Sequence, residues 1–195
     1  MKRFAFVTGI LALAAPLAIA QADQQVSTWA IDPAHSEVDF TIRHMSISNV
    51  HGRFGIKEGK ILFNDNDATK STVNVTIDVT TVDTGVSGRD NDLKGSSFFD
   101  VSAYPTATFV STLVTKEGNN LRVTGNLTLH GVTKPVTLDV EGPTAPVPGM
   151  DHKPHSGYTA TTTIKRTDFG IGSKFPAAML GEEIKLNIDL EVAKQ

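Results

Sequence analysis

Regular alternation of apolar and polar residues recurs along most of the chain and restricts its fold more than any other feature of the sequence. Near the C-terminus, apolar residues occupy every second position over residues 184–192. The same period of two runs through residues 38–42 and 73–79. Because successive side chains of a β-strand point to opposite faces, such segments are typical of strands that bury one face. The sequence therefore predicts an all-β protein.

Weaker segments of the same period bring the expected number of strands to eight or nine. They surround Trp29, Ile61 and Ala107 and cover residues 123–129, 136–140 and 158–164. Turn-forming residues separate them, and one short helix is expected over residues 90–94, stopping at Gly95. Short antiparallel strands joined by hairpins fold as a sandwich or a barrel, and the periodicity does not choose between the two.

Residues 1–20 have the pattern of a secretory signal peptide. Lys2 and Arg3 precede an apolar run that ends in small residues, and we expect cleavage after Ala20. The run falls short of the roughly 20 apolar residues of a spanning helix, and no later segment approaches that length. The mature protein, residues 21–195, is expected to be exported, not membrane-spanning, and folded as a single domain.

The composition of the chain limits its partners and its chemistry. About 175 residues are enough to bury a core without covalent cross-links. The sequence contains no cysteine, which excludes disulfides, a thiolate nucleophile and cysteine metal ligands. Its formal net charge is -3 and becomes more negative when Lys2 and Arg3 are removed. This balance argues against nucleic acid or an anionic membrane as the main partner.

A serine, a histidine and an aspartate suitable for a catalytic relay could be drawn from Ser36, His35 or His130, and Asp90. However, no glycines of a nucleophile elbow surround any serine, and adjacent residues of a strand point to opposite faces. Structural hydrogen bonding at strand ends is therefore favoured over catalysis. We assign no catalytic residue and expect no enzymatic activity.

A metal-like H-x-x-H pattern, His152 and His155, lies in the Pro- and Gly-rich loop of residues 142–157. The spacing could bring two imidazoles together, but a third ligand is not evident. Known zinc sites have stricter ligand patterns, so an exposed loop with incidental histidines is the favoured interpretation. We assign no metal site, and whether this loop binds a metal is left open.

Several motifs, taken in order, resemble the YceI family of bacterial periplasmic proteins, the polyisoprenoid-binding, lipocalin-like group. The resemblance spans residues 29–192 and is carried by WAIDPAHS at 29–36, RD at 89–90, FFD at 98–100, HGVTKP at 130–135 and RTDFGI at 166–171. It implies an extended antiparallel β-barrel of about eight strands with one short helical segment. It also implies a periplasmic location and a lumen that takes a long isoprenoid chain.

The resemblance leads us to expect a binding or carrier protein for a polyprenyl lipid or an isoprenoid quinone, with no cofactor required. The apolar phase of the strands supplies the expected lumen residues: Val38, Phe40, Ile42, Val75, Ile77, Phe98, Phe109, Leu127, Leu129, Leu138, Ile164, Phe169, Leu186 and Ile188. Candidates for contact with a head group at a barrel mouth are His35, His44, Arg89, His130 and Arg166. The competing interpretation is that these polar residues brace the barrel ends.

Two alternative functions remain open from the sequence. One is an enzyme that acts on a lipid held in the same lumen, and the other is a stress-response interaction module whose core is filled by its own side chains. His130 falls on the polar phase at a strand end, before Gly131, and is interpreted as a turn or rim residue. A homodimer through an exposed strand edge is open, but no residue argues for it.

Overall fold

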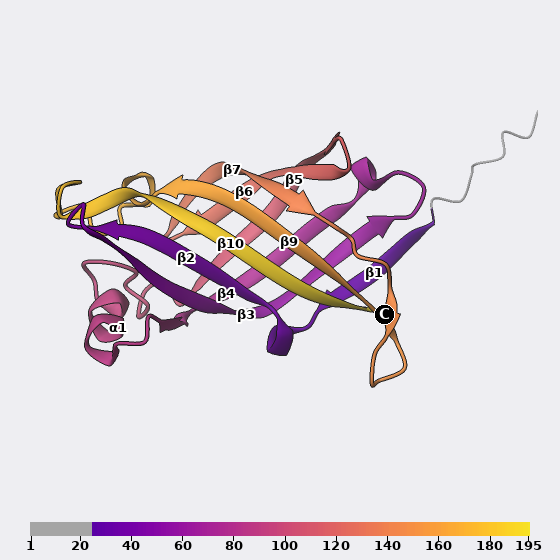
Figure 1. The fold of residues 1–195 in the computed structure, drawn as a ribbon, viewed down its shortest axis with the longest axis horizontal. Coiled ribbons are helices and arrows are strands. Elements are labelled where there is room, and N and C mark those ends of the chain that lie inside the picture. Colours follow the sequence, from indigo (N-terminus) through magenta and orange to yellow (C-terminus); the bar gives the residue numbers. More distant parts are fainter. Residues whose placement is uncertain (1–24) are drawn as a thin grey trace, which may run out of the picture.

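The computed structural model describes residues 25–195, and the signal peptide expected over residues 1–20 lies outside the described residues. The fold is an elongated barrel (Figure 1). Its strands are β1 (Val26–Ile31), β2 (Glu37–His44), β3 (Ser48–Asn64), β4 (Thr72–Asp83), β5 (Thr106–Glu117), β6 (Asn120–Leu129), β7 (Val132–Glu141), β8 (Val147–Pro148), β9 (Pro154–Lys165) and β10 (Leu180–Lys194). The helices are α1 (Ser87–Lys94) and three 3-10 turns, η1 (Pro33–His35), η2 (Ala68–Lys70) and η3 (Arg166–Phe169).

Eight antiparallel strands close into a ring in the order β10, β2, β3, β4, β5, β6, β7, β9, with β9 pairing back to β10. The ring excludes the sandwich and confirms the predicted barrel of about eight strands. β1 pairs with β10 and β3, the two strands that also flank β2. β1 and β2 therefore lie end to end between β10 and β3, and the 3-10 turn η1 separates them.

The inside of the ring is the hydrophobic core, and the period of two decides which residues enter it. In β6, every second residue from Leu121 to Leu129 is buried and the residues between them are exposed or half-buried. Irregular register in β3, between Arg53 and Gly55 and between Ile56 and Glu58, lets this long strand bend around the barrel. The alternation in the sequence therefore places apolar side chains inside the barrel and polar side chains outside it.

Two inward-facing glycines make room for phenylalanine rings on neighbouring strands. A Cβ atom built on Gly52 would lie 2.4 Å from Cζ of Phe40, and one on Gly125 would lie 2.5 Å from Cζ of Phe109. Each ring can lie against the backbone of the next strand only because the glycine has no side chain. The rings are thereby kept out of the centre of the barrel.

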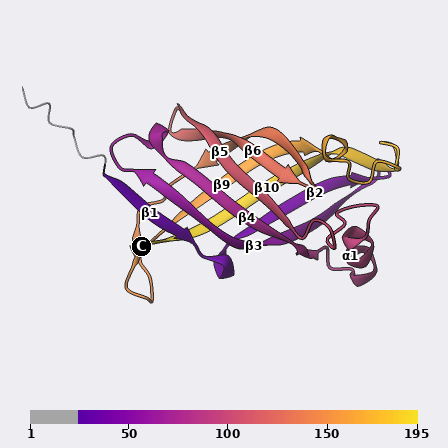
Figure 2. The same ribbon diagram turned by 180° about the vertical axis from the view of Figure 1, so that it is seen from behind.

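Helix α1 and the chain around it cover one end of the barrel (Figures 1 and 2). The helix begins at Ser87, before the predicted residue 90, and ends at Lys94, before Gly95. The side chain of Asp90 accepts hydrogen bonds from the backbone and hydroxyl of Thr84, which ties the helix to the end of β4. Within the described residues, no helix has the length and apolar character needed to cross a membrane.

Candidate functional site

The barrel encloses two adjoining cavities. The wide chamber has a volume of about 690 Å³ and extends to α1, while the narrow chamber, in the other half of the barrel, measures about 110 Å³. Four residues line both: Val38, Ile77, Leu127 and Leu186. These four come from β2, β4, β6 and β10, so the two chambers adjoin across side chains of these strands and together make up the lumen.

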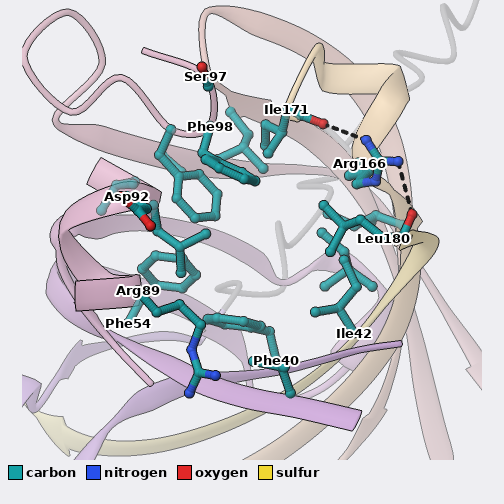
Figure 3. Close-up of a pocket in the computed structure, with 18 of the residues that line it drawn as sticks. Phe40, Ile42, Phe54, Arg89, Asp92, Ser97, Phe98, Arg166, Ile171 and Leu180 are labelled. Carbon is teal, nitrogen blue, oxygen red and sulfur yellow. Dashed lines mark hydrogen bonds between the residues drawn. The ribbon is translucent and has the colours of Figure 1, made fainter. Parts of the chain in front are cut away.

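Aromatic rings form much of the wall of the wide chamber (Figure 3). The rings of Phe40 and Phe54 have centroids 5.3 Å apart, and Phe99 meets Phe54 edge-on at 5.2 Å. On the opposite side, Phe98 stacks on Phe175 at 5.3 Å. Such packed rings present an apolar, shape-defined surface.

The polar residues that border the wide chamber come from α1 and the segment after it, from the end of β2 and from η3. They are His44, Arg89, Asn91, Asp92, Ser96, Ser97 and Arg166. The narrow chamber is lined mostly by aliphatic side chains, together with Phe63, Phe109, Tyr158 and three hydroxyl residues. A volume in the range of ordinary ligand sites, apolar walls and a polar end together suit an elongated apolar molecule with a polar head.

All of the expected lumen residues except Phe169 line one or both chambers. Those at the wide chamber are Val38, Phe40, Ile42, Ile77, Phe98, Leu127, Leu129, Ile164 and Leu186. Those added by the narrow chamber are Val75, Phe109, Leu138 and Ile188. Phe169 lies in η3, beyond the alternating strand β9, and is buried outside both cavities with 1 % exposure.

Other residues line the chambers that were not expected from the sequence. Phe54 and Ile56 of β3 line the wide and narrow chambers respectively, and their shared phase in the sequence could have found them. Phe175 and Ile171 line the wide chamber from the segment between η3 and β10. That segment has no regular period, so nothing in the sequence marked these two residues as luminal.

Arg166 borders the wide chamber but is only 1 % exposed, and its guanidinium is occupied by the protein itself. Its nitrogen atoms donate to five backbone carbonyls, those of Ile171, Gly172, Phe175, Leu180 and Gly181, two of which are marked in Figure 3. An arginine side chain has five N–H donors, so none remains for a ligand. Arg166 holds the segment between η3 and β10 against the barrel end.

Arg89 and His44 also border the wide chamber. Arg89 donates from Nε to the hydroxyl of Thr84 at 2.7 Å and from Nη2 to its carbonyl at 2.9 Å. Within the described chain, Nη1 of Arg89 has no hydrogen-bond partner. His44 is exposed at the end of β2. These two residues remain available to a polar group at this end of the lumen.

His130 and His35 line neither chamber. His130 occupies the turn between β6 and β7 at φ 51°, and its Nδ1 lies 3.0 Å from the carbonyl oxygen of Phe169. Its ring also meets that of Tyr104 edge-on, with centroids 4.9 Å apart. His130 therefore connects a hairpin to η3, while His35 lies in η1, in the wall between β1 and β2.

A group of ionisable side chains surrounds η1 on the outside of the barrel. His35 Nδ1 lies 2.9 Å from Asp32 Oδ2 and 4.0 Å from Glu191 Oε2. His155 lies between Glu191 Oε1, at 2.7 Å from Nδ1, and Asp151 Oδ1, at 3.0 Å from Nε2. Hydrogen bonds to Asp32 and Glu191 raise the pKa of His35 and of His155 respectively, and the His35 contact lowers the pKa of Asp32.

The H-x-x-H pattern of the sequence is not the geometry that the fold builds. His152 is an exposed turn residue at φ 64°, whereas His155 is directed to Asp151 and Glu191. Within residues 25–195, the group of three side chains placed to share a metal ion is Asp32, His35 and Glu191, which does not include His152. This set was not found from sequence because Glu191 is far from the other two along the chain.

The fold and the lumen define an extended, lipocalin-like antiparallel β-barrel with an apolar interior. The family model of the YceI-like domain matches residues 29–192, so the chain belongs to the YceI family, which confirms the resemblance seen in the motifs. A YceI protein from Salmonella newport is 39% identical over 165 residues, covering 83% of each chain.

Solved structures agree with this assignment. The Campylobacter jejuni YceI protein is 33% identical and superposes with a TM-score of 0.68, over 78% of this chain and 90% of that one. A polyisoprenoid binding domain from Saccharophagus degradans has a TM-score of 0.64 at 16% identity, covering 88% of this chain and 100% of that one. At that identity the second likeness concerns the fold alone.

Proposed function

We propose that this protein is a periplasmic carrier that sequesters a long isoprenoid lipid, a polyprenyl lipid or an isoprenoid quinone, in the barrel lumen. The observation that carries the proposal is an apolar cavity of about 690 Å³ inside the barrel, with the apolar narrow chamber adjoining it. No cofactor and no chemical step are needed, because the function is to remove the chain from water. The family membership and the polyisoprenoid binding domain with the same fold support this choice of ligand.

Burial of the chain accounts for the affinity. Each buried methylene group contributes about 0.8 kcal/mol, whereas association costs roughly 4–15 kcal/mol in lost motion. A few isoprene units inside the lumen are therefore enough to offset that cost. The branched aliphatic and aromatic walls offer an isoprenoid chain close contact, and such a chain has no hydrogen bonds to lose on entering.

The polar residues orient the lipid. The apolar tail runs through the wide chamber and ends in the narrow one, and the head group lies at the α1 end, near Arg89 and His44. Arg166 has no donor left for the head group. Asp92 also borders this end, so a quinone or a singly charged head is favoured over a highly charged one.

The alternatives fit the geometry less well. A core filled by its own side chains is at odds with a cavity of about 690 Å³. An enzyme acting on the bound lipid would need acid–base groups near it; His44 and Asp92 border the wide chamber, but the two histidines that the sequence offered for catalysis, His35 and His130, lie outside both chambers. Turnover of a bound lipid that stops when either histidine is replaced, with binding intact, would favour the enzyme.

The direct test is binding by the tag-free protein purified without detergent. Mass spectrometry of its organic extract should show an isoprenoid lipid, and the lipid-free protein should bind undecaprenyl phosphate and ubiquinone in titrations. Phe109→Asp places a charge in the narrow chamber, where Phe109 is 6% exposed, and should abolish binding.

Val110→Asp is the matched control, because Val110 neighbours Phe109 on β5 but faces outward with 44% exposure. It should bind as the unmodified protein does. Arg89→Ala should weaken the binding of undecaprenyl phosphate more than that of ubiquinone. If Phe109→Asp is folded by circular dichroism and still binds both lipids, the ligand is not held in the lumen and the proposal fails.

A further inference from the structure

The break in the barrel wall at η1 brings together ligand atoms from both ends of the mature chain. Asp32 begins the turn, and its Oδ1 accepts a hydrogen bond from the backbone of Ala34 at 2.8 Å. Oδ2 of Asp32 is thereby left to face His35, while Glu191 approaches from β10. One ligand atom from each of Asp32, His35 and Glu191 lies within 4.8 Å of the other two.

The backbone fixes this juxtaposition independently of any ion. The amide of Asp32 donates to the carbonyl of Glu191 at 2.9 Å. Ser36, at the end of η1, accepts from the amide of Glu191 at 3.0 Å and donates to its carbonyl at 3.3 Å. The backbone positions of both carboxylate residues are therefore fixed by hydrogen bonds between η1 and β10, so a site for a metal ion would be largely preformed.

His155 adds an outer partner to the group. Its Nδ1 is hydrogen-bonded to Oε1 of Glu191, and its Nε2 is hydrogen-bonded to Oδ1 of Asp151. The second oxygen, Oε2, is the one that faces His35. A metal-binding side chain whose remaining polar atom is hydrogen-bonded to a second residue is the usual arrangement around protein metal sites.

The spacing suits a small divalent ion. Ligand bonds of about 2.0–2.2 Å to one tetrahedral ion place neighbouring ligand atoms about 3.4 Å apart. The observed separations from His35 Nδ1, 2.9 Å to Asp32 and 4.0 Å to Glu191, bracket that value. The His35 side chain is 65% exposed, so it can make the required shift without disturbing the core.

We propose that Asp32, His35 and Glu191 form a binding site for a divalent transition-metal ion of the zinc type on the outer wall of the barrel. One imidazole nitrogen with two carboxylate oxygens suits Zn²⁺, whereas Ca²⁺ and Mg²⁺ prefer ligand sets made of oxygen alone. Three protein ligands leave a position for water or for a donor in the adjoining groove, which His35, Glu191 and His155 also line. The site lies outside the lumen and does not depend on the proposed lipid.

The test is calorimetric titration of the tag-free, lipid-free protein with zinc chloride, with calcium chloride as the oxygen-preferring comparison. One Zn²⁺ should bind per chain, with no matching signal for Ca²⁺. His35→Ala and Glu191→Gln should each lower the affinity for Zn²⁺ by about 100-fold or more, since each removes a metal ligand. His155→Ala, which removes an outer partner, should weaken it by about 10-fold.

His152→Ala is the matched control, because His152 is an exposed histidine on the loop that leads to His155 but lies outside the group. It should leave the Zn²⁺ affinity unchanged. The proposal is overturned if the unmodified protein takes up no stoichiometric Zn²⁺ or if His35→Ala binds it equally well. It also fails if His152→Ala abolishes the site, which would assign the metal to the H-x-x-H loop instead. Lipid binding by His35→Ala should be unchanged, which separates this result from the lumen.

Discussion

Gly52 controls the position of a phenylalanine in the wall of the wide chamber, so Gly52→Ala is an informative perturbation. The added Cβ would lie 2.4 Å and 2.7 Å from two ring carbons of Phe40, and 2.7 Å from the methyl group of Thr84. Non-bonded carbons normally approach to about 3.5–4.0 Å. The Phe40 ring must therefore retreat by about 1 Å, and the wide chamber is the open space beside it.

The magnitude follows from two opposing effects on stability and one on binding. Overpacking costs about 1–3 kcal/mol, while replacing a strand glycine by alanine returns about 0.5–1 kcal/mol of chain entropy. We expect a net loss of about 1 kcal/mol in the free energy of unfolding. If the displaced ring excludes about two methylene groups of the lipid, the loss of about 1.6 kcal/mol raises Kd roughly 10-fold.

Urea unfolding and titration with ubiquinone measure the two effects. Gly55→Ala is the matched control on the same strand, because its Cβ would meet its nearest neighbour, Oγ1 of Thr81, at an ordinary 3.4 Å. It should leave both quantities near those of the unmodified protein. In a Phe40→Ala background, Gly52→Ala should cause little further loss of lipid affinity, while the close approach to the Thr84 methyl group remains and keeps part of the cost in stability. Equal losses of affinity with and without the Phe40 ring would refute the reasoning.

Three further predictions concern residues around the lumen. Arg166→Met removes the donor from five backbone carbonyls, two of them in fully buried hydrogen bonds, and should lower the free energy of unfolding in urea by at least about 3 kcal/mol. Arg122→Met, which removes an exposed surface ion pair, should change it by no more than about 1 kcal/mol. His130→Ala loses the contact with the Phe169 carbonyl and should lower the free energy of unfolding by about 1–2 kcal/mol, with unchanged lipid affinity. Weaker lipid binding at full stability would instead place His130 in the site. Burial raises the pKa of Tyr158 to about 12, so the difference in alkaline absorbance between the unmodified protein and Tyr158→Phe should show a step near that pH. Because the folded state holds this proton more tightly than the unfolded chain, its contribution to stability is complete below pH 10 and should be lost as the pH rises from about 10 to 12; a step at pH 10 would show that the ring is solvated.

The sequence by itself determined the strands and the direction of their side chains. The period of two is a local property, since each residue's face follows from its position along its own strand. For this reason, Phe40, Phe109 and Leu127 could be assigned to the interior without knowledge of which strands pair. Phe169 lies beyond the end of this period, after β9, and its assignment to the lumen was wrong because it is buried outside both cavities.

Tertiary structure alone decided the closure of the ring, the volume of the lumen and the role of each polar residue. Arg166 looked like a residue for a head group, but the segment that folds back over it uses all five of its donors. The group at η1 depends on contacts such as that of Ser36 with Glu191, which are 155 residues apart. Such contacts follow from the register of distant strands, whereas periodicity reports only on the face of each strand.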